Sequence, residues 1–157
     1  MFAGAIVQSV VLPRFQLFGA RPDLVMLLVV IWASLRELDE AVLWGLMGGA
    51  FVDLLSAAPF GTEVLTLGIL AVLAGAVGPA LRRYHALLLL ALVPLATIAF
   101  YLLLAFVLES QAWTVDWPAT VALIVLPGCL VNTLATPLVY WFLRAANSWF
   151  QPRTWLG

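Results

Sequence analysis

Residues 45–61 read GLMGGAFVDLLSAAPFG, which is apolar enough for a lipid bilayer yet carries one carboxylate, Asp53, in its interior. Counting back by fours from this acid gives Gly49, Gly45 and Ala41, which share one face of a helix. Small residues let a second helix approach closely. Placing an ionisable group at membrane depth costs about 2.5 kcal/mol or more unless the group is paired or hydrated. The stretch therefore predicts a membrane helix that packs against other helices and keeps its acid away from lipid.

The composition of the whole chain indicates the same environment. The 157 residues are 65% hydrophobic and 10% charged, with a mean hydropathy of +1.12. Soluble domains carry about 25% charged residues. A membrane-spanning helix needs about 20 residues, so six of them would use about 120 and leave only short connections. We therefore expect an all-α, polytopic fold, with residues 1–157 forming a single six-helix transmembrane domain.

Charges and turn residues divide the chain into six apolar runs. The first lacks a basic leading region, so we expect a membrane segment that stays attached rather than a cleaved signal peptide. Pro22 suits the start of the second helix, and Pro59 with Gly61 marks the turn after the third. The predicted runs are Phe2–Phe18, Pro22–Leu35, Ala41–Ala57, Glu63–Leu81, His85–Leu108 and Pro118–Leu143.

The basic residues predict how the chain is oriented. All seven are arginines, and five fall on one side of the predicted spans and two on the other. By the positive-inside rule, the side with five is cytoplasmic, so both termini are expected in the cytoplasm. The net charge of -1 gives no reason to expect nucleic acid as a partner. The larger group is Arg36, Arg82, Arg83, Arg144 and Arg153, and the smaller is Arg14 and Arg21.

Asp53 has three interpretations from the sequence alone. It is a structural residue bonded to a neighbouring helix, a contact for a partner or ligand, or a proton relay. The predicted orientation places it near the loop that holds Arg21 and Asp23, so an ion pair between Asp53 and Arg21 is the structural alternative we expect. Such a pair would neutralise both charges at modest cost.

The small residues also have two interpretations. Gly45 and Gly49 form a GxxxG spacing, which packs either an internal helix or a partner's helix. The fourth run has its own small track, and the two tracks are expected to face each other or to flank a shared neighbour. In the sixth run Asn132 is a candidate for a hydrogen bond between helices. The track in the fourth run consists of Gly68, Ala71, Gly75 and Gly78.

The sequence gives little support to catalysis. An aspartyl intramembrane protease needs two intramembrane aspartates, and Asp53 alone qualifies. His85 is the single histidine and Cys129 the single cysteine, and no nucleophile, metal-ligand or phosphate-binding motif occurs. Glu63, Glu109 and Asp116 are expected to be solvated ends of loops. We expect neither enzymatic activity nor a cofactor nor a metal.

Motifs over nearly the whole chain resemble the MreD family of bacterial rod shape-determining membrane proteins. The last helix resembles that of the family from Leu126–Pro127 through Asn132 and on to Pro137 and Tyr140. The N-terminus departs from the family pattern because it lacks a basic lead-in before the first helix. The other matching pieces are Gln8–Ser9, Leu12–Pro13, Arg21–Pro22–Asp23, Gly45, Gly49, Asp53, Leu54, Ser56, Pro59 and Gly61.

The resemblance implies a non-enzymatic part of the machinery that elongates the bacterial cell wall, located in the inner membrane. It implies direct binding to MreC, a protein with a single transmembrane helix, and association through it with the MreB filament and with RodA and its transpeptidase. It also implies a fold similar to the substrate-binding subunits of energy-coupling-factor transporters. Membrane lipid is the remaining expected contact.

Two functional hypotheses follow. The first is a scaffold that captures the transmembrane helix of MreC, with the Gly45–Gly49–Asp53 stripe, the Arg21–Asp23 loop and Asn132 as candidate partner-binding or helix-packing residues. The alternative is a small-molecule-binding subunit of an energy-coupling-factor-type transporter, with a pocket that opens outward between the helices. Transporter subunits of that type dock their coupling module through an AxxxA-like track on the first helix, whereas this chain has Ala3 followed by Val7.

Overall fold

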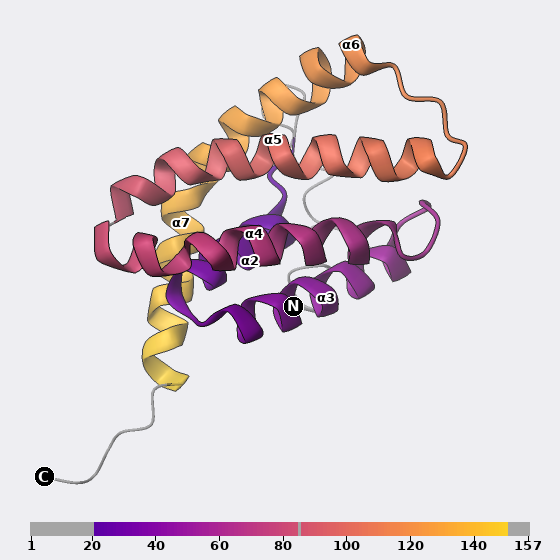
Figure 1. Cartoon of the computed structure of the whole chain (residues 1–157). Helices are drawn as coiled ribbons and strands as arrows, with labels where there is room; N and C mark the ends of the chain where they lie inside the picture. Colours follow the sequence, from indigo (N-terminus) through magenta and orange to yellow (C-terminus); the bar gives the residue numbers. More distant parts are fainter. Residues whose placement is uncertain (1–20, 85, 151–157) are drawn as a thin grey trace, which may run out of the picture.

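The computed structural model describes residues 21–84 and 86–150, so the predicted first run, Phe2–Phe18, lies outside the described residues. Every described element is a helix, and the last three form one continuous helical stretch (Figure 1). In chain order the elements are α2 (Leu24–Leu35), α3 (Leu38–Leu55), α4 (Thr62–Tyr84), α5 (Ala86–Ser110), α6 (Trp117–Thr120), the π-helix η3 (Val121–Val125) and α7 (Leu126–Phe150).

The second predicted run begins two residues later than expected because of a capping residue. We predicted a helix from Pro22, but α2 begins at Leu24. Asp23 is the N-cap, and its carboxylate accepts a hydrogen bond from the Met26 N–H at 3.1 Å. A carboxylate in this position satisfies an N–H that has no partner within the helix. Pro22 therefore precedes the cap instead of starting the helix.

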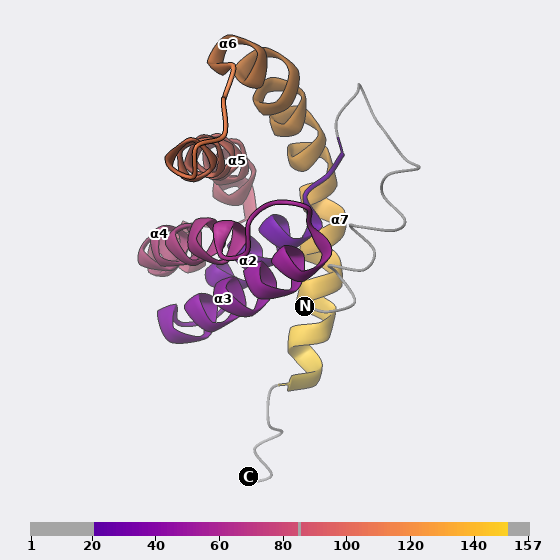
Figure 2. The same ribbon diagram turned by 90° about the vertical axis from the view of Figure 1, so that its right-hand side faces the viewer.

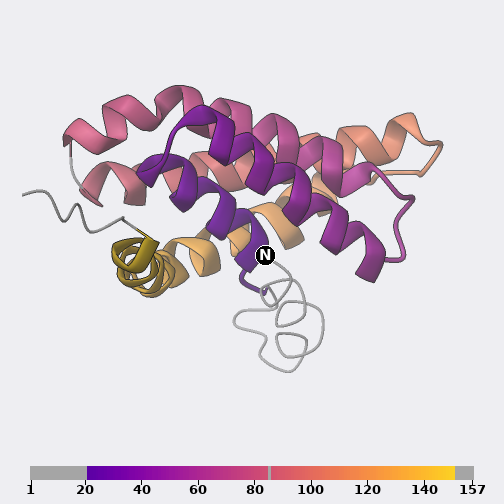
Figure 3. The same ribbon diagram turned by 90° about the horizontal axis from the view of Figure 1, so that it is seen from below.

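The helix α2 forms the centre of the bundle. It is apolar on all faces, and such a helix is buried on all faces in a packed structure. It packs against α3, α4, α5 and α7, and Figure 2 shows it enclosed between its neighbours. Seen from below, α3 and α4 run alongside each other (Figure 3). The fully buried apolar residues of α2 are Val25, Met26, Leu27, Val29, Val30, Ile31 and Ala33.

Two ends of the bundle can be distinguished. The end that holds the C-terminus of α3 and the N-terminus of α4 is here called the Asp53 end. The opposite end, which holds the α2–α3 turn, is called the Arg36 end. The end of α5 also lies at the Asp53 end, because α4 and α5 run in opposite directions. The start of α2 lies nearer the middle of the bundle (Figure 1).

The surface of the bundle is apolar where a soluble protein would be polar. Two helical stretches, Leu89–Ser110 and Trp117–Ala145, are long and apolar enough to cross a membrane, and Leu24–Leu35 and Thr62–Gly78 are shorter apolar helices. Leu134 and Leu138 are 68% and 72% exposed. Large exposed apolar surfaces mark contact with lipid or with other proteins.

Candidate partner-binding and helix-packing site

The carboxylate of Asp53 caps the helix that follows it in the chain. The residue is 4% exposed although it is charged. Its Oδ2 accepts hydrogen bonds from the N–H groups of Gly61 and Val64 at 2.9 Å and 3.1 Å, and its Oδ1 accepts one from Glu63 at 3.0 Å. The first N–H groups of a helix have no partner within it, and the helix dipole places partial positive charge there. Asp53 therefore supplies both the acceptors and the opposite charge to α4.

The turn between α3 and α4 brings these groups together. Gly61 has a φ of +101°, a left-handed conformation that glycine adopts without steric cost. The carbonyl of Pro59 accepts hydrogen bonds from the Thr62 N–H at 3.3 Å and from the Thr62 hydroxyl at 2.7 Å. The turn thus directs the start of α4 back toward the last turn of α3, where Asp53 lies.

The predicted ion pair between Asp53 and Arg21 is wrong. Arg21 is exposed, and the three bonds of the Asp53 carboxylate go to backbone N–H groups of the α3–α4 turn and α4. The reason is that backbone donors at the edge of a bilayer have little water to bond with, so they need an acceptor from the protein. A carboxylate on the adjacent helix meets that need directly.

The glycine stripe of α3 is covered by α4. A Cβ added at Gly45 would lie 2.6 Å from the Cβ of Ala71 and 2.7 Å from the carbonyl oxygen of Leu67. A Cβ added at Gly49 would lie 2.5 Å from the Cα of Val64, which is backbone. The stripe on α3 and the small track on α4 face each other. Because α4 occupies this face, it is not free to receive a helix from a partner.

Asn132 connects three parts of the bundle. It is fully buried, and its Oδ1 accepts a hydrogen bond from the Asp23 N–H at 2.8 Å. Its Nδ2 donates to the hydroxyl of Thr97 at 3.3 Å, and that hydroxyl donates to the Val93 carbonyl at 2.8 Å. The amide therefore links α7 to the start of α2 and to the middle of α5.

We expect Asn132→Leu to destabilise the protein because it leaves the Asp23 N–H without its acceptor. A lost bond to a buried polar group costs about 1–3 kcal/mol. Thermal unfolding in detergent micelles measures the loss. Thr133→Val is the matched control, because the Thr133 hydroxyl bonds only to the Cys129 carbonyl of its own helix, at 2.6 Å. Equal melting temperatures for the two variants would contradict a linking role for Asn132.

Glu63 was predicted to be a solvated loop end, and this prediction is wrong. The residue is half-buried, and its Oε2 is buried with no hydrogen-bond partner. It lies in the first turn of α4, next to the cap that Asp53 provides. The sequence places an acid at the start of a helix, where the dipole favours it, but does not reveal how closely the turn packs. By contrast, Glu109 and Asp116 are exposed.

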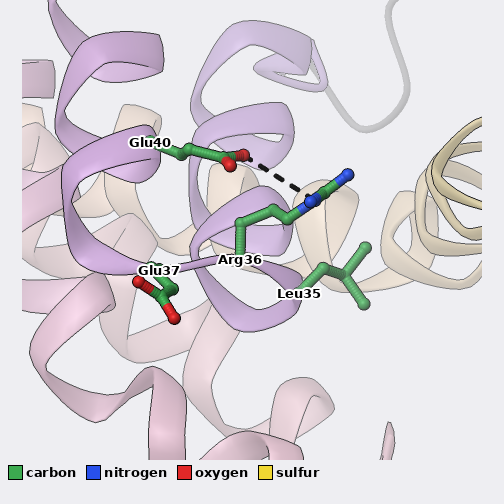
Figure 4. A pocket seen from close by; sticks show the side chains of 4 residues that line it. All are labelled: Leu35, Arg36, Glu37 and Glu40. Carbon is green, nitrogen blue, oxygen red and sulfur yellow. Dashed lines mark ion pairs between the residues drawn. The ribbon is translucent and has the colours of Figure 1, made fainter. Parts of the chain in front are cut away.

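A group of aromatic and charged residues lies at the Arg36 end. The arginine pattern of the sequence assigned Arg36 to this side of the membrane but did not predict the contacts that it makes. Trp32 stacks on Trp44 with 4.3 Å between ring centroids, and the Arg36 guanidinium lies 5.4 Å from the Trp32 ring centroid. Arg36 also pairs with Glu40, with 3.7 Å between Nε and Oε2 (Figure 4). A pocket of about 370 Å³ at this turn is lined by Leu35, Arg36, Glu37 and Glu40.

The fold and these contacts define a class of protein. Over residues 21–84 and 86–150 no group of three or more His, Cys, Asp or Glu residues is placed to hold a metal ion. The buried side chains of Asp53 and Asn132 bond to other elements of the bundle. The buried hydroxyls of Thr66, Thr97 and Thr136 each donate to a carbonyl four residues earlier in their own helix. Apolar helices of membrane length, with polar groups used to hold helices together, describe a polytopic membrane protein.

Comparison with known proteins identifies the family. Residues 1–146 match the family described as rod shape-determining protein MreD, and the chain belongs to that family. It is therefore a non-enzymatic membrane protein that determines cell shape, as the sequence motifs predicted. No curated protein and no solved structure matches the chain significantly.

Proposed function

We propose that the protein is a scaffold of the bacterial cell-elongation complex in the inner membrane. In this proposal it binds the single transmembrane helix of MreC, and through MreC it links the MreB filament to RodA and its transpeptidase. Family membership supports the setting. The observation that carries the scaffold proposal is the use of Asp53 and Asn132 to join helices, which commits these two buried polar side chains to structure.

The surface we propose for MreC is a ridge on α7 rather than the glycine stripe. Four leucines repeat at four-residue spacing along this helix and form a single row on its surface. Asn132, which accepts a hydrogen bond from the Asp23 N–H, lies on the opposite, buried face of α7, so the row faces away from the bundle. The ridge consists of Leu126, Leu130, Leu134 and Leu138, which are 59%, 62%, 68% and 72% exposed.

Helix association in lipid depends on close packing, because lipid chains are as apolar as leucine. We therefore expect the double variant Leu130→Ala with Leu134→Ala to lower the recovery of MreC when the two proteins are purified together in mild detergent. Leu65→Ala with Leu73→Ala is the matched control on α4, where both leucines are also exposed, at 55% and 51%. The control is expected to recover MreC as the unaltered protein does.

Two outcomes of this experiment contradict different parts of the proposal. Full recovery of MreC by a folded α7 variant would reject the ridge as its binding surface. Full recovery of MreC whose own transmembrane helix is replaced by an unrelated one would reject helix capture altogether. The transporter alternative predicts instead that a small-molecule ligand is retained in the purified protein.

A further inference from the structure

The segment that leads into α7 stands away from the rest of the bundle. α6 has no buried residue, and within η3 only Val125 is buried. Residues 121–124 are all exposed. Four consecutive exposed residues cover most of one turn of this π-helix, so the arm has little contact with the rest of the bundle there. Figure 1 and Figure 2 both show α6 at the edge of the bundle. Residues 117–124 are called the arm below.

Close packing begins again directly after the arm. Val125 is 3% exposed, and Gly128 is buried against α5. A Cβ added at Gly128 would lie 2.8 Å from Cε2 of the Tyr101 ring. Glycine therefore allows α7 and α5 to cross closely at this level. The arm extends from a fixed crossing point.

The backbone is irregular at two places near the arm. A π-turn lies at the base of the arm, and one residue with a left-handed conformation lies in the loop before the arm. The Leu126 N–H bonds to the carbonyl of Val121, five residues earlier, as in a π-helix. Such turns interrupt the regular hydrogen-bond ladder and occur where helices bend. Ala112, in the loop before the arm, has a φ of 65°, which is left-handed. Gln111 holds the start of that loop on α4 through a 3.1 Å bond from Nε2 to the Thr62 hydroxyl.

We propose that the arm is a hinged element that swings about the crossing of Gly128 and Tyr101, opening and closing an apolar wedge against the last turns of α5. Figure 1 shows the arm and the last turns of α5 diverging from this crossing, and both carry exposed apolar side chains: Leu123 on the arm is 70% exposed, and Leu102 and Phe106 on α5 are 37% and 64% exposed. Lipid chains solvate the apolar surfaces of the arm and of α5 about as well as these two surfaces would solvate each other. Small differences in packing therefore decide how the open and closed arrangements are populated.

Distances between spin labels in the full chain, reconstituted in lipid nanodiscs, test this proposal. Labels at Phe106→Cys and Leu123→Cys, in a Cys129→Ala background, report the wedge. Labels at Leu95→Cys and Leu134→Cys are the matched control, because they lie on α5 and α7 beyond the crossing and are 63% and 68% exposed. We expect a broad distance distribution, or one with two maxima, for the wedge pair and a single narrow one for the control.

Deleting Ala122 removes one residue from the π-helix and restores regular helical hydrogen bonding. We expect this deletion to narrow the wedge distribution to the width of the control. A wedge distribution as narrow as the control in the undeleted chain would show a rigid arm and overturn the proposal, whether or not the deletion variant folds. A distribution that stays broad after the deletion would overturn the placement of the hinge at η3.

Discussion

We expect Asp53→Ala to lose most of the stability that holds α4 against α3. The change leaves the N–H groups of Gly61, Glu63 and Val64 without the acceptor that each now uses. An unsatisfied buried donor costs about 1–3 kcal/mol, so we expect a combined loss of about 3–5 kcal/mol after partial rehydration of the turn. Thermal unfolding in detergent micelles, followed by circular dichroism, measures this loss.

The variant Asp53→Asn distinguishes the effect of the side chain's charge from the effect of its shape. The amide keeps the size of the side chain but offers one acceptor oxygen where three donors converge, so an intermediate loss is expected. Asp116→Asn is the matched control. Asp116 also caps a helix, with its Oδ1 accepting from the Ala119 N–H at 3.2 Å, but it is exposed. Wild-type stability in Asp53→Asn, with loss of MreC binding alone, would contradict the capping role and restore the partner-contact hypothesis.

The second large effect is expected at Gly49. Gly49→Ala places a methyl group 2.5 Å from the Cα of Val64 and 2.6 Å from the carbonyl oxygen of Glu63. Both contacts are backbone, so the two helices must move apart. Overpacking costs about 1–3 kcal/mol, and we expect the upper part of that range because no side chain can rotate away. The melting temperature and the yield of monodisperse protein should both fall.

Gly68→Ala is the matched control for Gly49→Ala. Its new Cβ would lie 3.0 Å from Cδ2 of Leu46, the end of a flexible side chain that can shift. Alanine is favoured over glycine within a helix by about 1 kcal/mol, so this variant is expected to be neutral or slightly more stable. Equal destabilisation of the two variants would mean that the stripe at Gly49 is no more closely packed than the rest of the interface.

Much of this arrangement follows from the sequence because it depends on local patterns. Apolar runs bounded by charges and turn residues located the ends of the described helices to within three residues, except that α7 extends seven residues beyond the predicted end at Leu143. Four-residue spacing placed Gly45, Gly49 and Asp53 on one face of a helix. Because a lipid-exposed carboxylate is costly, this face was predicted to point into the bundle. The family motifs gave the correct family.

What the sequence did not show depends on the path of the backbone. The partner of Asp53 is the start of α4, and only the left-handed turn at Gly61 brings those N–H groups within reach. The burial of the Glu63 Oε2 atom also depends on the path of the backbone through this turn. The π-turn at η3 is a shift in hydrogen bonding that residues 121–125, all apolar, do not signal. Six spans and cytoplasmic termini stay predictions.

The central claim is that α4, and not a partner protein, covers the glycine stripe of α3. A disulfide tests this most directly, because a Cβ at Gly75 would lie 3.7 Å from the Cβ of Ala41. Disulfide-bonded residues have Cβ atoms about 3.5–4.5 Å apart. We predict that Ala41→Cys with Gly75→Cys, in a Cys129→Ala background, forms an intrachain disulfide on mild oxidation in cells that lack MreC. Free thiols at both positions in folded protein, which become protected only when MreC is supplied, would contradict the account.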